Sequence, residues 1–368
     1  MKMFPALEKK YSKENMTALQ AQRLAQEIAF APVVFQVSRL MIKFGIFQML
    51  VDSEKGMTID EVAQKAGLSR YAAQVLLEAS LTAGTVLFRN ERFELSKAGW
   101  FLLNDDSVRA NIDFNHDVNY VGLFRLEEAL LNGKPEGLKH FGSWDTIYEG
   151  LSKLPDDVQK SWFGFDHFYS DLSFDEALKI VFSYPVRTLL DVGGNTGRWA
   201  LRCVDFNSDV KVTILDLPQQ LELMKENIKG KNGCERISGH SGNLLDKNVP
   251  FPENFDAILM SQFLDCFSED EITSILTRAA ASMNRNSSLF IMETFWDRQR
   301  FETSAFILTQ VSLYFTALAN GNSKMYHSGD MIRCVEAAGL MVENIYDDLG
   351  LGGHSILVCK RMDNEGKF

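Results

Sequence analysis

Cysteine is scarce in this chain, and its spacing excludes two kinds of fold. Five cysteines occur among 368 residues, the number is odd, and no two have the Cys-x-x-Cys spacing. A disulfide framework and a zinc ribbon both need paired cysteines, so the sequence indicates neither. We interpret the cysteines as reduced thiols in the core and expect no metal site. They are Cys203, Cys234, Cys266, Cys334 and Cys359.

Long apolar runs are also missing. Residues 1–11 are charged where a secretory signal would be apolar, and no later stretch has the roughly 18 uninterrupted apolar residues of a membrane-spanning helix. These absences predict a cytoplasmic protein without a membrane partner. The length and the hydrophobic content of 46% suffice for two domains, each with its own core.

Positive charge is in short supply. The chain has 38 Lys and Arg against 49 Asp and Glu, which gives a formal net charge of -11. Nucleic-acid binding depends on Lys and Arg side chains that neutralise phosphates. We therefore expect no nucleic-acid partner and a ligand that is neutral or cationic.

The chain does contain a glycine-rich turn between an apolar strand and a helix. The strand carries Asp191, the turn carries Gly193, Gly194 and Gly197, and a second apolar strand ends in Asp216. Glycines allow a tight turn and a close backbone approach, while a carboxylate at the tip of the second strand can accept hydrogen bonds from ribose hydroxyls. The combination predicts a nucleotide-cofactor pocket.

The position of Asp191 distinguishes between cofactors. A dinucleotide site has Gly-x-Gly-x-x-Gly facing a pyrophosphate, which a carboxylate before the turn would repel. A ligand with an ammonium group would instead be attracted. S-adenosylmethionine carries an ammonium, a sulfonium and a ribose diol without phosphate, so we interpret the turn as a methyl-donor site. The alternatives are a dinucleotide site and a purely structural turn.

These motifs resemble those of the winged-helix S-adenosylmethionine-dependent O-methyltransferases that act on small aromatic hydroxyls. The resemblance rests on Asp-Val-Gly-Gly-x-Thr-Gly at 191–197, Asp-Leu-Pro at 216–218 and an acidic helix start near Ser268, and it covers most of the chain. Residues 262–271 are also similar to methyltransferases associated with bacterial aryl polyene pigment synthesis. The resemblance implies methyl transfer from S-adenosylmethionine.

The expected organisation has three parts: a winged-helix dimerisation domain at 1–103, a helical linker at 104–184 and a Rossmann-like domain at 185–368. Residues 20–50 show helical apolar spacing interrupted by Pro32, which predicts two helices. A capped helix from Thr58, a second helix over 70–83 and a hairpin over 86–95 complete a winged helix. Residues 69–85 carry only two charges, Arg70 and Glu78, which argues against DNA reading. The apolar surplus of residues 20–50 predicts a homodimer.

The last part alternates strands and helices, which predicts an α/β fold with a doubly wound, mostly parallel sheet. We expect strands near 188–193, 211–216, 235–240, 255–261, 288–294, 341–348 and 354–361. Ligands of such sheets bind at the carboxyl ends of the strands. The predicted donor site consists of Asp191, Gly193, Gly194, Gly197, Asp216, Leu217, Asn243, Leu244, Ser261, Gln262 and Phe267.

Two donor-site positions depart from the resembled family. The family usually has an aspartate at position 243, which accepts a hydrogen bond from the adenine amine, and Asn243 can still accept through its carbonyl oxygen. The alternative is a loop asparagine without contact to a ligand. Asn195 stands where the family has its middle glycine, and asparagine tolerates left-handed backbone.

The larger departure follows the fourth strand. The resembled family has Leu-His-Asp-Trp-Ser, with histidine as the general base, whereas this chain has Asp265, Cys266 and Phe267 at the last three positions before Ser268. Three interpretations follow: Asp265 is a tuned base, it orients a histidine (His167, His327 or His354), or the nucleophile is a ring carbon ortho to a phenol. The alternative is that Asp265 caps the helix near Ser268. In the resembled family two acids flank the base: Glu293 stands at the position of one, and His327 and Asp330 are possible replacements for the other. Two facing carboxylates, Asp265 and Glu293, would repel unless one is protonated.

Aromatic residues at helical spacing fill 104–184, and core packing is their ordinary role. The dense run at 162–169 predicts in addition that Trp162, His167 and Phe168 line a substrate cavity. Core packing is also the ordinary role of the long apolar helix over 302–320, and in the resembled fold this helix, with Phe315, would roof that cavity. The sequence thus favours O-methylation of a small aromatic acceptor. The alternatives are C-methylation of a phenol ring, a non-catalytic relative and a transcription factor with a ligand domain.

Overall fold

The computed structural model describes residues 4–350 and 353–362. Lys13–Val118 form one compact unit, and the described residues up to Ser12 form a second unit with those from Asn119 onward. The first residues join the second unit because Phe4 N donates to the Asp297 carbonyl oxygen and Leu7 is buried. This division differs from the expected three parts, which assigned residues 1–12 to the smaller domain and ended that domain at 103.

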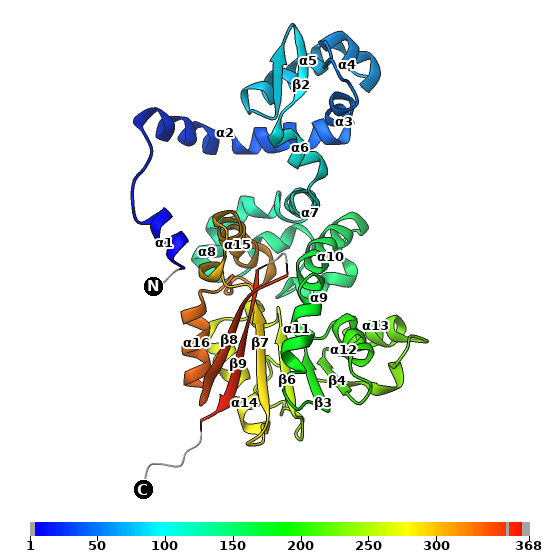
Figure 1. The fold of residues 1–368 in the computed structure, drawn as a ribbon, viewed down its shortest axis with the longest axis vertical. Helices are drawn as coiled ribbons and strands as arrows, with labels where there is room; N and C mark the ends of the chain where they lie inside the picture. The colour runs from blue at the N-terminus through cyan, green and yellow to red at the C-terminus, as the bar shows by residue number, and fades with distance from the viewer. Residues whose placement is uncertain (1–3, 351–352, 363–368) are drawn as a thin grey trace. The chain divides into compact units, whose positions relative to one another are not determined.

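The smaller unit is a set of capped helices around one hairpin (Figure 1). Thr58 closes a capping box with Glu61, and the Ser69 side chain accepts from Ala72 N. The hairpin turns at Asn90 and Glu91 with φ of 49° and 61°, as a tight two-residue turn requires. Its elements are α2 Ala18–Lys43, α3 Ile46–Val51, α4 Ile59–Ala66, α5 Arg70–Thr82, β1 Val86–Arg89, β2 Arg92–Leu95, α6 Lys97–Asn104 and α7 Asp106–Phe114.

The expectation that Pro32 separates two helices is wrong. Helix α2 runs through Pro32 without a break, and the chain turns only at Gly45, which has a φ of 69°. Proline removes one N–H donor, and a helix secured at both ends can absorb that loss. Thr17 caps the start of α2 with a capping box, and Met41 near its end is fully buried in the core of the unit.

The larger unit contains a seven-stranded sheet with helices on both faces (Figure 1). Its helices of four or more residues are α1 Pro5–Tyr11, η2 Gly122–Arg125, α8 Leu126–Asn132, η3 Glu136–His140, α9 Ile147–Gly150, α10 Asp156–Asp171, α11 Phe174–Val181, α12 Arg198–Phe206, α13 Pro218–Ile228, α14 Glu269–Ser282, α15 Glu302–Tyr314, η8 Phe315–Ala319 and α16 Ser328–Ala337. Its strands are β3 Thr188–Val192, β4 Lys211–Asp216, β5 Ile237–Ser241, β6 Ala257–Ser261, β7 Ser288–Glu293, β8 Leu340–Leu349 and β9 His354–Arg361.

The strand order is β5-β4-β3-β6-β7-β9-β8, and only β9 runs antiparallel to its two neighbours. Each expected strand is present, and the doubly wound α/β class is confirmed. Strands β3 and β6 are neighbours although β4 and β5 separate them in sequence. The order therefore reverses between β3 and β6, and the crevice at their carboxyl ends is where ligands of such sheets bind.

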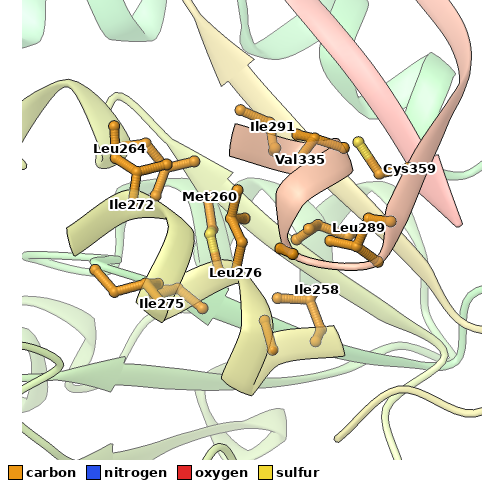
Figure 2. Packing of buried hydrophobic residues seen from close by; sticks show 14 of the residues in the cluster. Ile258, Met260, Leu264, Ile272, Ile275, Leu276, Leu289, Ile291, Val335 and Cys359 are labelled. Carbon is orange, nitrogen blue, oxygen red and sulfur yellow. The ribbon is translucent and has the colours of Figure 1, made fainter. Parts of the chain in front are cut away.

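Alternate residues along each central strand enter two different cores. Leu190 and Val192 of β3 pack with α14 and α16, whereas Leu189 packs with α11, α12 and α13 on the opposite face. Figure 2 shows the first core, in which Ile272, Leu276 and Val335 meet strand residues such as Met260, Leu289 and Ile291. Burial on both faces explains the almost continuous apolar strand sequences. It also fixes the strand ends from which the site projects.

No helix within residues 4–350 and 353–362 combines the length and apolar character that a membrane crossing requires.

Candidate active site

Asp191 lies at the end of β3 with only 2% of its surface exposed. Its Oδ2 has no hydrogen-bond partner among the described residues. Burial, and after it the nearby Asp216 charge, raises the pKa of this carboxyl to about 7. Burying an acceptor atom without a hydrogen-bond donor costs free energy. A ligand with a cationic donor group would supply the missing hydrogen bond.

Asp216 at the end of β4 connects the glycine-rich turn to the next helix. Its Oδ1 accepts from Leu217 N at 2.7 Å and its Oδ2 accepts from Asn195 N at 2.9 Å. Burial raises its pKa, and the two backbone hydrogen bonds oppose that shift. The carboxylate is thereby held in one orientation, with lone pairs left for further donors.

The glycine-rich turn depends on the absence of side chains. Gly193 has a φ of 72°, and a Cβ added there would lie 2.4 Å from Cδ2 of Phe263. A Cβ on Gly194 would lie 2.5 Å from Asp191 Oδ2. Asn195 takes a φ of 48°, in agreement with its expected tolerance of left-handed backbone. The turn is thus a narrow cradle that leaves backbone and Asp191 facing the crevice.

The opposite wall of the crevice comes from the end of β6. Gln262 has a φ of 45°, its N–H donates to the Met292 carbonyl oxygen, and its Oε1 is buried without a partner among the described residues. Asn195 Oδ1 is buried and unpartnered in the same sense. With Asp191 Oδ2, three buried acceptors without donors belong to the turn and strand ends around this crevice. Such a set fits a ligand rich in donors, as S-adenosylmethionine is with its ammonium, adenine amine and ribose hydroxyls.

Asn243 and its neighbours form the outer side of the predicted donor site. The exposed Asn243 accepts from Leu245 N at 3.0 Å through Oδ1, the contact of an ordinary loop asparagine. Leu244 is buried, and the half-buried Phe267 packs its ring 4.8 Å from that of Phe263. These positions stay a prediction for adenine contact, and the side chain of Asn243 already has a local partner.

Asp265 occupies the short helix η6, Leu264–Cys266, and is 6% exposed. The alternative that it caps the next helix is wrong, because Ser268 caps α14 through a capping box with Glu271. The Cys266 thiol donates to Asp265 Oδ1 at 3.4 Å, and Tyr148 Oη donates to Cys266 Sγ at 3.1 Å. Burial raises the pKa of Asp265 to about 6, above that of a solvated carboxylate.

Glu293 lies next to Asp265 at the end of β7 and is 2% exposed. Its Oε1 accepts from Phe263 N at 3.0 Å and Leu264 N at 2.9 Å, whereas its Oε2 has no partner among the described residues. Burial first, and the Asp265 charge second, raise the pKa of Glu293 well above its ordinary value. A raised pKa favours the protonated form of Glu293, and protonation of one of the two acids would relieve the repulsion expected of two facing carboxylates.

Each of the three candidate histidine partners of Asp265 has a different setting. His167 Nδ1 lies 3.1 Å from Nη1 of Arg198. His327 begins α16, where Nδ1 accepts from Gly329 N at 2.9 Å and Nε2 lies 3.5 Å from Oδ2 of Asp297. His354 is fully buried, both ring nitrogens lack partners among the described residues, and burial lowers its pKa to about 4. These contacts favour Asp265 itself over a histidine as the group that meets an acceptor.

The expected acceptor-lining residues lie on α10 and at the end of α15. Trp162 is buried and its Nε1 donates to Tyr314 Oη at 2.7 Å, beside the buried Phe315. His167 and Phe168 are half-buried. Sequence reasoning missed Asp166, one helical turn after Trp162, whose pKa is raised to about 7 by burial and then by the Asp265 charge. The sequence feature that could have identified Asp166 is the presence of a carboxyl within the aromatic run at 162–169.

A reversed-order sheet with an antiparallel last-but-one strand, a glycine-rich turn and acids at the ends of β3 and β4 define a Rossmann-like methyltransferase. Residues 125–339 match the family model of the O-methyltransferase domain, and residues 22–93 match that of the Dimerisation2-like domain. The chain belongs to the O-methyltransferase family. It is a methyltransferase that uses S-adenosylmethionine.

Several known proteins are similar to this chain. Acetylserotonin O-methyltransferase of Gallus gallus is 21% identical over 297 residues, which are 75% of this chain and 83% of that protein. The apo structure of the S-adenosylmethionine-dependent methyltransferase SibL has a TM-score of 0.70 at 21% identity and covers 91% of this chain and 98% of its own. NcsB1 in complex with S-adenosylmethionine and 2-hydroxy-5-methyl naphthoic acid has a TM-score of 0.66 at 18% identity, with 89% and 96% covered. These structures share the fold with this chain.

Proposed function

We propose that the protein transfers the methyl group of S-adenosylmethionine to the hydroxyl oxygen of a small aromatic acceptor, with Asp265 facing that hydroxyl. The observation that carries the proposal is the placement of Asp265, a buried carboxyl among aromatic side chains whose pKa is raised to about 6. The NcsB1 structure, which contains a naphthoic acid, supports an aromatic acceptor by analogy.

The donor would be held by the crevice between β3 and β6. Asp191 Oδ2 would receive the ammonium group, Asp216 would accept from the ribose hydroxyls, and the unpartnered Oε1 of Gln262 would take a further donor. Gly193 and Gly194 permit the close approach, and Phe267 would cover the adenine ring. The bound donor supplies a methyl group on a positively charged sulfur.

On the acceptor side, Asp265 would accept a hydrogen bond from the hydroxyl and take its proton as the oxygen–carbon bond forms. Proton removal by a positioned group contributes typically about 10²- to 10⁴-fold. A carboxylate with a pKa near 6 is a better acceptor than a solvated one, although it stays weaker than a phenolate of pKa about 10. Holding the hydroxyl in line with the methyl group would therefore provide much of the rate. Glu293 would keep η6 in place through its hydrogen bonds to Phe263 N and Leu264 N.

We also propose that two copies of the chain associate through the smaller unit. Helix α2 exposes several large apolar side chains, and the match of residues 22–93 to a Dimerisation2-like domain supports self-association. A helix that exposes this many large apolar side chains presents the kind of surface that an identical subunit covers. The residues are Leu19, Leu24, Ile28, Phe30, Val33 and Val34, with exposed fractions from 37% to 77%.

The proposal is tested by calorimetric titration with S-adenosylmethionine and S-adenosylhomocysteine, with NAD as the control ligand, followed by a phenol screen with mass detection. We expect micromolar binding of both donor-type ligands, no binding of NAD, and a product heavier by one methyl group. Fragment spectra then separate an O-methyl from a ring C-methyl product. Donor binding without any methylated product would favour the non-catalytic alternative.

A further inference from the structure

Tyr148 and Cys266 form a chain of side-chain hydrogen bonds that ends on Asp265. Tyr148 Oη donates to Cys266 Sγ at 3.1 Å, and the Cys266 thiol donates to Asp265 Oδ1 at 3.4 Å. Tyr148 lies on α9, 118 positions before Cys266 in the sequence. The fold therefore brings a phenol from a separate helix to the thiol that contacts the proposed base.

The backbone on both sides of Asp265 is held by other residues. Glu293 Oε1 accepts from the N–H groups of the two residues before Asp265. Asn320 Nδ2 and Tyr326 Oη donate to the carbonyl oxygens of the two residues after it, at 2.5 and 2.6 Å. The Tyr148 hydroxyl, in contrast, bonds to a side chain. Its influence on Asp265 therefore passes through the thiol, and the position of η6 does not depend on it.

The direction of both hydrogen bonds is fixed. Burial raises the pKa of Tyr148 and that of Cys266 well above their ordinary values. Each group thus keeps its proton in the neutral pH range, so that the phenol donates to the sulfur and the thiol donates to the carboxylate. A hydrogen bond donated to a carboxylate favours its ionised form. The thiol therefore opposes the effect of burial on Asp265.

The phenol makes the thiol a better donor. A thiol alone is a weak hydrogen-bond donor, and a group that accepts one hydrogen bond becomes polarised and donates its own more strongly. The thiol also occupies Oδ1 of Asp265, which leaves Oδ2 for an acceptor hydroxyl. The chain therefore acts on the charge of the carboxylate and on its orientation.

The charge of Asp265 also acts on four ionisable groups of other elements. In each of them burial is the main cause of a raised pKa and the Asp265 charge is a further cause. They are Glu293 on β7, Asp166 on α10, Tyr314 on α15 and Tyr326 ahead of α16. All four remain when Tyr148 or Cys266 is substituted, so they form a constant background for a test of the chain.

We propose that Tyr148 is a positioning residue for methyl transfer, which acts through Cys266 to hold Asp265 ionised with Oδ2 toward the acceptor hydroxyl. This inference rests on the proposed function, because the state of Asp265 affects turnover only if this carboxylate meets the acceptor. The chain of hydrogen bonds exists without an acceptor, so it can be tested separately from turnover.

The infrared S–H stretching band of Cys266 reports the chain in the full-length protein without any ligand. The band is assigned as the one that Cys266→Ser removes, and its frequency falls as the hydrogen bond of the thiol strengthens. We expect the band to move as the pH passes about 6, the pKa of Asp265, and Asp265→Asn to remove this pH dependence. In Tyr148→Phe the band should lie at higher frequency, and the midpoint should rise by about 0.3 pH unit.

The matched control is Tyr326→Phe. This variant also removes a tyrosine hydroxyl next to η6, but that hydroxyl donates to the carbonyl oxygen of Phe267 and to no part of the chain. Because Glu293 and Asn320 still hold the backbone, Tyr326→Phe should leave the midpoint of the Cys266 band unchanged.

Turnover gives the functional readout, with the phenol that is methylated fastest in the screen as the acceptor. In Tyr148→Phe the acid limb of kcat should move to higher pH by about the same amount as the band midpoint, with KM changed less than about twofold. Cys266→Ala removes the donor to the carboxylate and should move the limb by about one pH unit. In the Cys266→Ala background, Tyr148→Phe should cause no further shift, because the phenol acts through the sulfur.

A Cys266 band that ignores pH in the wild type, or that is the same in Tyr148→Phe, would overturn the inference even if a phenol is methylated, and the proposed function would then stand. A shift of the acid limb by Tyr148→Phe that persists in Cys266→Ala would also overturn it. If the band behaved as expected but no phenol was methylated, the positioning role would be refuted together with the proposed function, and the non-catalytic alternative would be favoured.

Discussion

The two sides of the crevice are built by different means. On the donor side, strand ends and a glycine-rich turn set the backbone, and Asp216 is fixed by N–H groups of Asn195 and Leu217. On the acceptor side, Trp162 of α10 and Tyr314 of α15 meet through their side chains, and Asp265 of η6 accepts from the Cys266 thiol. A site made by backbone geometry keeps its sequence pattern, whereas a site made by side chains from separate helices can change its chemistry while the fold stays the same.

The substitution with the largest expected effect disrupts the acceptor side alone. Asp265→Asn should lower kcat by about 100-fold or more, because it removes the group that takes the hydroxyl proton. The dissociation constant for S-adenosylmethionine should change by less than about threefold, since Asp265 is not among the groups proposed to hold the donor. Steady-state kinetics and calorimetry measure the two quantities. Asp270→Asn, an exposed acid nearby, is the control, and an unchanged kcat in Asp265→Asn would remove Asp265 from the reaction.

The complementary change breaks the donor side. Asp191→Asn should weaken S-adenosylmethionine binding by about 100-fold, because a buried carboxylate facing an ammonium is typically worth more than 2 kcal/mol. Asp209→Asn, an exposed acid in the same unit, should bind normally. An Asp191→Asn protein with wild-type affinity would contradict the assignment.

The same variant should be more stable than the wild type above neutral pH. The folded-state pKa of Asp191 is raised to about 7, so its contribution to stability is present below the unfolded pKa and is lost as the pH rises through 7. Asparagine has no such loss. We expect Asp191→Asn to melt at higher temperature than the wild type at pH 8, and the gap to narrow at pH 5. If Asp191→Asn melted at a lower temperature than the wild type at pH 8, the buried charge of Asp191 would be stabilised by other groups in the folded protein.

Substitution of two glycines that both have positive φ separates the cost of a steric clash from the cost of backbone strain. Gly193→Ala places a Cβ 2.4 Å from Phe263 at a φ of 72°, and should lower the free energy of unfolding by about 2–4 kcal/mol. Gly230→Ala has a similar φ of 74° with no atom within 4 Å, so it should cost only about 1–2 kcal/mol. Chemical denaturation measures both. Equal losses would mean that contact with Phe263 is unimportant.

The pH dependence of turnover tests the chemistry of the acceptor side. Asp265 must be ionised to accept a proton, and its pKa is raised to about 6. At saturating donor and acceptor, kcat should rise with pH through 6 and be about tenfold lower at pH 5 than on the plateau. Activity that increases only toward the pKa of the acceptor phenol would indicate a reaction without base assistance.

The smallest effect is expected at position 243, where the chain departs from the resembled family. Asn243→Asp restores the usual carboxylate, but the Asn243 side chain is exposed and bonded to Leu245 N. The donor dissociation constant should change by less than about threefold, within the range of an exposed polar contact. A much tighter complex would identify position 243 as an adenine contact that asparagine serves poorly.

The sequence was sufficient for features that local chemistry determines. The hairpin at Asn90–Glu91, the cap at Thr58 and the strand ends near Asp191 and Asp216 follow from turn chemistry, capping and apolar periodicity. The prediction at Pro32 failed because the start of α2 is capped and its end is buried, which outweighs the local preference of proline.

The acceptor side was harder to predict because it depends on which helical side chains meet. The hydrogen bond between Trp162 and Tyr314 joins residues on separate helices that are 152 positions apart in the sequence, so it became visible only in the fold. His167, His327 and His354 were reasonable partners for Asp265 by residue type. Their contacts with Arg198, Asp297 and the core are tertiary facts that spacing cannot supply.

The most direct test of the donor site is the number of protons released when S-adenosylmethionine binds, measured by calorimetry at pH 7 in two buffers of different ionisation enthalpy. Asp191 has a pKa of about 7 in the free protein and would become fully ionised against the ammonium group, so about half a proton should be released. Asp191→Asn should release none. Tight binding of the donor without proton release by the wild type would contradict the account.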